Sequence, residues 1–183
     1  WQLGQDEQAK KFGSIVGGVK VEDLNGNGRI DPADRQIIGS DVPKLVGGLT
    51  NRLSFKGFDL SVLAFARFGS TIQSPFHGSF RYLSGRVNQY NIDYWTLTNP
   101  SNEYPRPNVN QESPLYGSTL SYFDGSFVKI RNISLGYTFP PNLAQQLRVQ
   151  SLRVYLSAQN PFVFSSYTSK YSGIDPEFPT TST

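Results

Sequence analysis

Cysteine and methionine are both absent from the 183 residues of this chain. Without cysteine, neither a disulfide framework nor a thiolate metal site can form. The chain begins with Trp1 and shows neither an initiator methionine nor a secretory leader. We therefore expect it to be a piece of a longer protein.

Long hydrophobic runs are also missing. A membrane helix needs about 18 apolar residues in succession. The longest apolar-rich run, Leu60 to Phe68, has nine residues and includes Ser61 and Arg67. This length is too short for a membrane helix but suits a tilted transmembrane strand of about 9 to 11 residues. The lack of an apolar helix is therefore compatible with a membrane protein.

Charge of one sign is not concentrated anywhere in the chain. The 17 basic and 14 acidic residues are scattered and leave a net charge of +3. No run forms a patch for nucleic acid or lipid headgroups, so we expect no nucleic-acid partner. Aromatic residues are abundant instead: 10 Tyr, 13 Phe and 2 Trp make up 14%, beside 17 Gly and 12 Pro. This composition favours an all-β fold with many loops.

One segment carries a strong chemical motif. Residues 23–34 have the spacing of a calcium-binding loop, with glycine (Gly28) at the sharp turn of position 6. The predicted ligands to a structural Ca²⁺ ion are Asp23, Asn25, Asn27, Arg29 through its carbonyl, Asp31 and Asp34. Asn27 replaces the usual acid and Asp34 replaces a longer glutamate, which predicts a weak site suited to millimolar extracellular calcium. The alternative is that this cluster simply forms turns.

The flanks of the loop differ from those of a full EF-hand. Residues 16–22 are rich in glycine and β-branched side chains and predict a strand before the loop. After it, Asp31 can cap a short helix that has Pro32 at its first position and ends at Gly39. The polar residues 6–11 can form another short helix.

Alternation of apolar and polar residues predicts two pairs of antiparallel strands. Residues 47–69 form a hairpin around a tight turn at Lys56-Gly57, and residues 127–139 pair with 152–159. A change of phase after Ile130 predicts a bulge near Asn132, and Pro161 is expected to close the last strand. The apolar face of the second strand comprises Phe58, Leu60, Val62, Ala64, Ala66 and Phe68, of which all but Ala66 are predicted to meet lipid. Arg52, Ser54 and Arg67 are expected to face a barrel interior or to lie near its rim.

The connections between these strands are very unequal in length. Lys56-Gly57 and residues 140–150 are short, whereas residues 22–46, 70–126 and those from 160 onward are long. Because antiparallel strands reverse direction, both short turns fall at one end of the sheet and the long segments at the other. Outer-membrane barrels sort their connections this way, with short periplasmic turns and long extracellular loops. A soluble sandwich has no reason to do so.

The segment 70–126 is too long for an ordinary connection and is expected to be functional or packed on its own side chains. Four of its rings are candidates for stacking on cargo: Tyr90, Tyr94, Trp95 and Tyr104. The alternative is that these rings pack the loop against its neighbours. The single histidine, His77, is expected to be an ordinary loop residue.

Several phrases of the sequence, in order and spacing, resemble the C-terminal barrel of SusC/RagA-type TonB-dependent outer-membrane transporters. The phrases are residues 26–39, Gly47-Gly48-Leu49-Thr50-Asn51, Lys56-Gly57-Phe58-Asp59-Leu60, Tyr94-Trp95-Thr96, Asn99-Pro100, Tyr104-Pro105-Arg106, 126–137, 152–161 and Gly173-Ile174-Asp175-Pro176-Glu177. The likeness covers essentially the whole chain.

This resemblance implies a 22-stranded transmembrane barrel in the outer membrane of a Bacteroidota-type bacterium. Such a transporter imports oligosaccharides or peptides, pairs with a SusD-like surface lipoprotein and draws energy through TonB. Residues 1–183 would form a C-terminal part of the barrel. The plug domain, the TonB-contacting region and the final strand are expected to lie outside this sequence.

Two other classes compete with this interpretation. A secreted calcium-binding β-domain that binds carbohydrate would share the metal loop and the aromatic residues. A glycosidase would need two carboxylates across a cleft. No such pair is suggested outside the calcium loop, and no nucleophile motif is present, so we expect no enzyme activity.

Overall fold

The computed structural model describes residues 1–74, 77, 93–108, 114–171 and 173–178. The chain divides into two compact units. The loop unit contains Trp1–Ile38 and Gln73–Tyr122, and the sheet unit contains Gly39–Ile72 and Phe123–Thr181. Among the described residues, no helix has the length and apolar character needed to cross a membrane.

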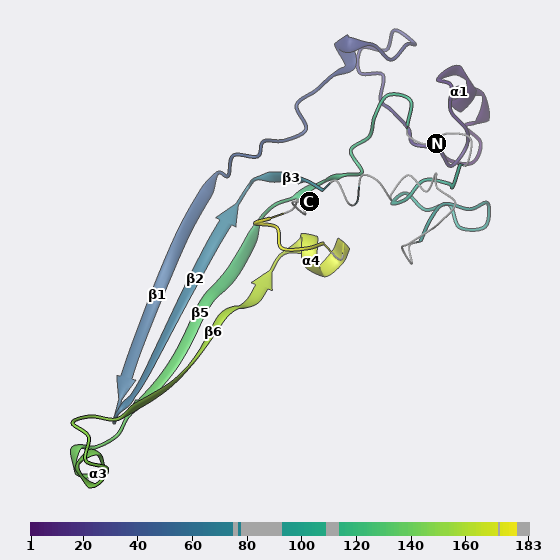
Figure 1. Cartoon of the computed structure of the whole chain (residues 1–183). Helices are drawn as coiled ribbons and strands as arrows, with labels where there is room; N and C mark the ends of the chain where they lie inside the picture. Colours follow the sequence, from purple (N-terminus) through teal and green to yellow (C-terminus); the bar gives the residue numbers. More distant parts are fainter. Residues whose placement is uncertain (75–76, 78–92, 109–113, 172, 179–183) are drawn as a thin grey trace. The chain divides into compact units, whose positions relative to one another are not determined.

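Four long antiparallel strands lie side by side in the sheet unit (Figure 1). In spatial order they are β1 (Leu45–Phe55), β2 (Phe58–Phe68), β5 (Phe127–Thr138) and β6 (Arg153–Phe164). Both predicted pairs are present. The long segment between β2 and β5 therefore connects two strands that are neighbours in the sheet.

The two short connections lie at the same end of this sheet (Figure 1). Lys56 and Gly57 join β1 to β2 with φ angles of 46° and 88°, the two positive values that a type I′ turn requires. The other connection contains the helix α3 (Pro141–Gln146). The opposite end of the sheet joins the long segments, as the sequence predicts.

A bulge interrupts the sheet near its predicted position. The register of β5 shifts between Ile130 and Asn132, and two residues of β6, Asn160 and Pro161, lie opposite the single residue Arg131. The prediction that Pro161 ends this strand is wrong, because β6 continues to Phe164. Pro161 has no N–H to donate to the neighbouring strand, and a bulge tolerates such a residue. Asn160, the other residue of the bulge, adopts a φ angle of 49°.

A small core and further short elements complete the sheet unit. The short strands β3 (Thr71–Gln73) and β4 (Tyr122–Asp124) pair with each other, and α4 (Ser166–Tyr171) follows β6. Phe123 packs between two rings, with centroids 5.1 Å from Tyr167 and 5.0 Å from Tyr171. Ile72 joins this cluster. The core fixes α4 beside the chain segments that leave β2 and enter β5.

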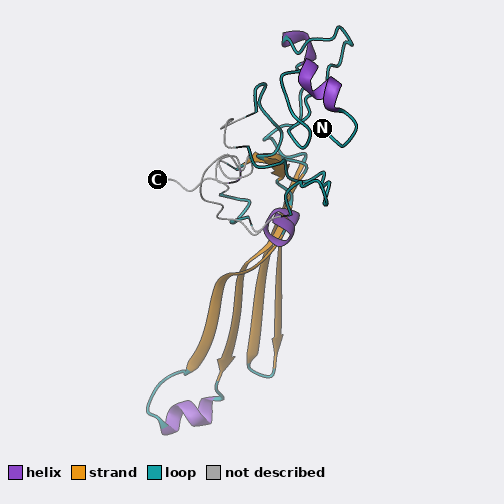
Figure 2. Ribbon diagram, turned by 90° about the vertical axis from the view of Figure 1, so that its right-hand side faces the viewer, coloured by secondary structure: helices purple, strands orange, loops and turns teal. Residues whose placement is uncertain are grey.

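In the described residues of the loop unit, the short helix α1 (Asp6–Lys11) and the 3-10 turn η1 (Pro32–Asp34) are set in long stretches of coil (Figure 2). The strand predicted over residues 16–22 is wrong. Gly17, with a φ angle of 84°, donates its N–H to the Trp1 carbonyl and accepts at its own carbonyl from the Arg106 N–H. These distant contacts hold the stretch in a turn.

The helix predicted after the calcium loop begins where expected but is shorter. Asp31 caps it and Pro32 occupies its first position, yet it ends at Asp34 and does not reach Gly39. Arg35 is already extended, with a ψ angle of 130°. The helix after the calcium loop therefore consists of a single turn.

Candidate membrane-facing sheet and metal loop

The register divides the side chains of the long sheet into two faces of opposite character. Residues opposite each other in antiparallel strands point to the same face. The apolar face is built, strand by strand, from Leu45, Leu49, Leu53 and Phe55; Phe58, Leu60, Val62, Ala64, Ala66 and Phe68; Val128, Ile130, Ile133, Leu135 and Tyr137; and Val154, Leu156, Ala158, Phe162 and Phe164. Asn51 is a polar interruption in this pattern.

The apolar face is uncovered within the part of the chain that the structure describes. Leu49, Phe55 and Leu156 expose 68%, 71% and 77% of their surface. A contiguous apolar surface over four strands is unfavourable in water and marks contact with hydrocarbon or with another protein.

Aromatic rings gather at both ends of the apolar face. At the end with the short connections, the Tyr137 ring lies 4.5 Å from that of Phe58 and 4.9 Å from that of Phe139. At the other end, the rings of Phe162 and Phe164 stack at 6.4 Å. Aliphatic side chains between two aromatic bands are typical of a strand that crosses a bilayer, since rings favour the water–lipid interfaces.

The opposite, polar face carries the charged side chains of the strands. The register places Arg52, Ser54 and Arg67 there, as expected for residues that face a barrel interior. Arg153 of β6 reaches Asp59 of β2 at 2.6 Å across the intervening strand. The bridge passes directly over Gly136 of β5, where a Cβ would lie 2.6 Å from atoms of both partners.

The predicted calcium loop is closed by hydrogen bonds from its backbone to its own carboxylates. Asp23 accepts from the N–H groups of Gly26 at 2.8 Å and Gly28 at 2.7 Å. Asp34 accepts from Leu24 at 2.9 Å and from Asp31 at 2.8 Å. The first and last positions of the motif are thereby brought together in one ring.

The remaining predicted ligands lie along the same ring. Asn25 accepts from the Asn27 N–H at 2.9 Å, and Asn27 accepts from the Arg29 N–H at 2.8 Å. The Asn27 amide nitrogen donates to Asp31 at 3.0 Å. Over the described ranges, no three His, Asp or Glu side chains converge into a ready-made metal cage.

The backbone also favours the charged form of the last loop position. The hydrogen bond from the Asp31 N–H lowers the pKa of Asp34 below its ordinary value of 3.8, with smaller contributions from Asn25 and Leu24 and partial opposition from desolvation. A lowered pKa means that this carboxylate stabilises the loop at pH values above 3.8. That contribution is lost only as the pH falls through the lowered pKa.

The structure brings together three of the four aromatic residues predicted to contact cargo. Tyr94 and Tyr104 form a parallel bridge, and the Trp95 N–H donates to the Tyr104 carbonyl at 3.1 Å. Trp95 is buried, and its indole N–H donates to Gln2 at 2.9 Å. Tyr94 is exposed, and Tyr90 lies outside the described residues. Contact of these rings with cargo stays a prediction.

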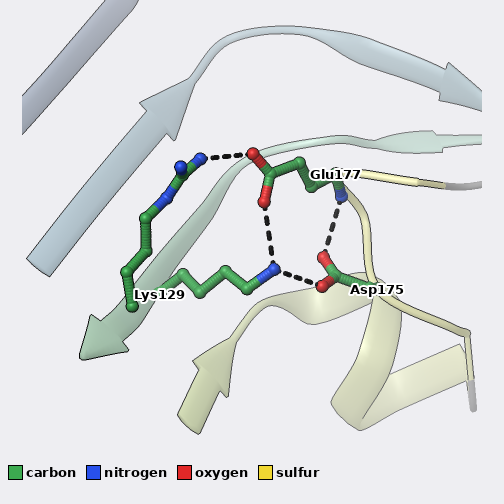
Figure 3. A network of polar contacts seen from close by, with 4 residues as sticks. Lys129, Asp175 and Glu177 are labelled. Atoms are coloured by element: carbon green, nitrogen blue, oxygen red, sulfur yellow. Dashed lines mark hydrogen bonds and ion pairs between the residues drawn. The ribbon is translucent and has the colours of Figure 1, made fainter. Parts of the chain in front are cut away.

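A network of charges on the polar face was not predicted from the sequence. Lys129 and Arg131 of β5 pair with Asp175 and Glu177 (Figure 3). The signal available in the sequence was a pair of bases two residues apart and a pair of acids at the same spacing. Nothing in their local pattern indicated that they meet.

The features of the sheet define a class of protein. An antiparallel sheet with one exposed apolar face, one charged face, aromatic bands at both ends and its long connections at one end is the wall of a transmembrane β-barrel. The relatives of this chain belong to that class.

Comparison with curated proteins gives clear relatives, although no family model matches the chain. TonB-dependent receptor P3 of Formosa agariphila is 35% identical over 167 residues, which are 90% of this chain and 16% of that protein. TonB-dependent receptor SusC of Bacteroides thetaiotaomicron is 31% identical over 160 residues, 85% of this chain and 15% of SusC.

Solved structures show the same likeness. The RagAB peptide importer in its closed-closed state matches with a TM-score of 0.62 and 27% identity, over 85% of this chain and 17% of the matched chain. Its open-open state matches with a TM-score of 0.60 and 29% identity, over 78% of this chain and 15% of the matched chain.

This chain is a segment of a SusC/RagA-type TonB-dependent transporter. The likeness to these receptors places the chain in the outer membrane. The chain spans only 15% to 17% of the length of the curated relatives it matches.

Proposed function

We propose that the sheet unit forms part of the barrel wall of an outer-membrane importer of oligosaccharides or peptides. The importer would work with a SusD-like lipoprotein as its lid and receive energy through TonB. The observation that carries this proposal is the two-faced sheet with its sorted connections. One of the matched structures is itself described as a peptide importer, which supports import as the activity.

The edges of the sheet support the same conclusion. β1 and β6 are the outer strands of the four, so each offers one side of its backbone for further pairing. Exposed edges favour aggregation, and barrel closure removes them. We infer that neighbouring strands of the longer protein pair with both edges. A secreted β-domain, the competing interpretation, would instead cover its apolar face with a second layer of its own.

The direction of the sheet in the membrane can be tested with epitope tags. In the full-length transporter, a tag after Asn99 should be accessible to antibody on intact cells, because the long segments face the cell surface. A tag after Gln150, in the α3 connection, should be inaccessible until the outer membrane is permeabilised. Detection of the second tag alone on intact cells would reverse the proposed topology.

We further propose that residues 23–34 bind one structural Ca²⁺ ion. The ligands would be side-chain oxygens of Asp23, Asn25, Asn27, Asp31 and Asp34 together with the carbonyl of Arg29. The donor set fits calcium, which prefers oxygen ligands. Support comes from the ring that the backbone already forms and from the lowered pKa of Asp34. The ion would offset the repulsion among three carboxylates.

Replacing Asp23 with alanine should abolish this site, since Asp23 also accepts the N–H groups that shape the turn. Calorimetric titration of the full-length transporter with Ca²⁺ should show one site fewer for Asp23→Ala than for the unaltered protein. Asp6→Ala, which removes an exposed acid from α1, should leave the titration unchanged. Identical titrations for Asp23→Ala and the unaltered protein would contradict the proposal.

A further inference from the structure

A short strap, residues 173–178, lies against β5 through charged side chains. The Lys129 ammonium is 2.5 Å from Asp175 and 3.0 Å from Glu177. Arg131 donates to the other oxygen of Glu177. Figure 3 shows the two carboxylates meeting the Lys129 ammonium from the strap side. Two cations of the sheet are thus matched by two anions of the strap.

While the strap covers Lys129, the buried ammonium group of this residue needs an anionic partner. The Lys129 side chain is 4% exposed, against 27% for Asp175 and 20% for Glu177. An ammonium group that is removed from water without a partner is strongly unfavourable. The strap therefore remains docked only if it supplies carboxylates.

Both cations belong to the sheet, although the Lys129 ammonium also lies 5.9 Å from the centre of the Phe178 ring of the strap. Lys129 lies on the polar face opposite Phe65. Arg131 occupies the bulge, and its guanidinium lies 4.2 Å from the centre of the Phe65 ring. Stacking on a ring leaves the edge of a guanidinium free to donate to a carboxylate. β5 thus supplies both cations of the site, and β2 positions Arg131 through Phe65.

Arg131 has donor capacity beyond what the strap uses. Its side chain is 39% exposed, whereas its Nε is buried and has no hydrogen-bond partner among the described residues. A guanidinium can bind a carboxylate through two parallel hydrogen bonds, whereas the contact with Glu177 uses Nη2. A ligand carboxylate could therefore approach the exposed part of the Arg131 side chain before the strap leaves, and the buried Nε would gain a partner only if the guanidinium turned.

The contact between strap and sheet is of a kind that can be exchanged. Gly173 anchors the strap to α4 by donating to the Tyr167 carbonyl at 2.9 Å, so release from β5 need not displace α4. Carboxylates of a ligand would restore the same bonds to Lys129 and Arg131. Replacement of one carboxylate pair by another leaves no buried charge unpaired.

We propose that Lys129 and Arg131 form a carboxylate-binding site on the inner wall, which Asp175 and Glu177 fill as internal ligands until cargo with two neighbouring carboxylates replaces them. The cargo would be an acidic peptide or a uronic-acid oligosaccharide. This inference rests on the proposed importer function, because it assigns a chemical class to the imported molecule.

The strap can be followed in the full-length transporter in lipid nanodiscs with a spin label at Ile174→Cys, an exposed position. A blocked Asp-Pro-Glu tripeptide, which copies the strap, should raise the label's mobility in a saturable way. The Asn-Pro-Gln tripeptide is the matched control and should not. Digalacturonate, tested in parallel, identifies whether sugar acids or peptides are preferred.

Variants of the charged residues distinguish a strap that a ligand can displace from a strap that stays bound to β5. In Lys129→Gln/Arg131→Gln the label should be mobile from the start, and peptide affinity should fall at least about tenfold, as expected for one lost charge-assisted hydrogen bond. Arg153→Gln, at the other end of the same face, should behave like the unaltered protein. Asp175→Asn/Glu177→Gln should free the strap and bind Asp-Pro-Glu more tightly.

Two results would overturn the inference. One is a label that neither Asp-Pro-Glu nor digalacturonate mobilises; the other is unchanged peptide affinity in Lys129→Gln/Arg131→Gln. Uptake of labelled tripeptide by cells tests the importer function separately. Strap displacement without uptake would contradict import and leave the site intact, whereas uptake without displacement would contradict the site alone.

Discussion

Replacing Val62 with arginine should destabilise the full-length transporter by about 2 to 4 kcal/mol. Val62 lies at the middle of β2 on the apolar face, opposite Ile133 of β5. At mid-membrane depth an arginine there would place its charge in hydrocarbon, where no water or carboxylate compensates it. The free energy of unfolding in lipid vesicles, measured by urea titration, gives the effect directly.

Leu63→Arg is the matched control for this experiment. Leu63 is the next residue of β2, at nearly the same depth, but it lies on the polar face opposite Asn132. Its replacement should change the free energy of unfolding by less than about 1 kcal/mol, since the new charge faces the barrel interior. Equal decreases in the free energy of unfolding for the two variants would show that lipid does not contact one face of β2 in preference to the other.

Replacing Gly17 with alanine should destabilise the loop unit by about 2 to 5 kcal/mol, the sum of backbone strain and overpacking. Gly17 has a φ angle of 84°, which disfavours any Cβ. A Cβ would also lie 2.5 Å from the Trp95 ring and 2.8 Å from the Arg106 Cβ. Because Trp95 is buried, its ring cannot move aside without exposing apolar surface.

Hydrogen exchange measures this effect in the full-length protein. Amides in residues 93–108 should exchange faster in Gly17→Ala, since the strand-like contact of Trp95 with Tyr104 is loosened. Gly117→Ala provides the control, because Gly117 has a similar φ angle of 81° but no atom within 4 Å of its would-be Cβ. Gly117→Ala should therefore show only the effect of backbone strain on the exchange rate and no effect of overpacking. Equal acceleration of exchange in both variants would exclude the packing explanation.

The long strands and their two faces could be predicted from the sequence because the alternation of apolar and polar residues is local. Residues 58–68 carry the period of two within a single strand, and Lys56-Gly57 supplies the positive φ angles that its turn needs. The bulge was visible as a break in the same alternation. In the calcium loop, the hydrogen bonds likewise connect residues that are close in the sequence.

The parts that could not be predicted depend on distant residues. Residues 16–22 have the composition of a strand, but Trp1 and Arg106 occupy the backbone groups of Gly17. Pro161 would normally end a strand, yet the bulge beside Arg131 makes room for it. Lys129 meets Asp175 across 46 positions of the chain, a separation at which no local pattern operates.

We infer that β2 has one face toward lipid and the other toward an aqueous interior. Single cysteines along β2 of the full-length transporter in outer membranes, probed with a lipid-soluble maleimide, test this most directly. We predict strong labelling of Leu60→Cys, Val62→Cys and Ala64→Cys. Labelling confined instead to Asp59→Cys, Ser61→Cys and Leu63→Cys would contradict the claim.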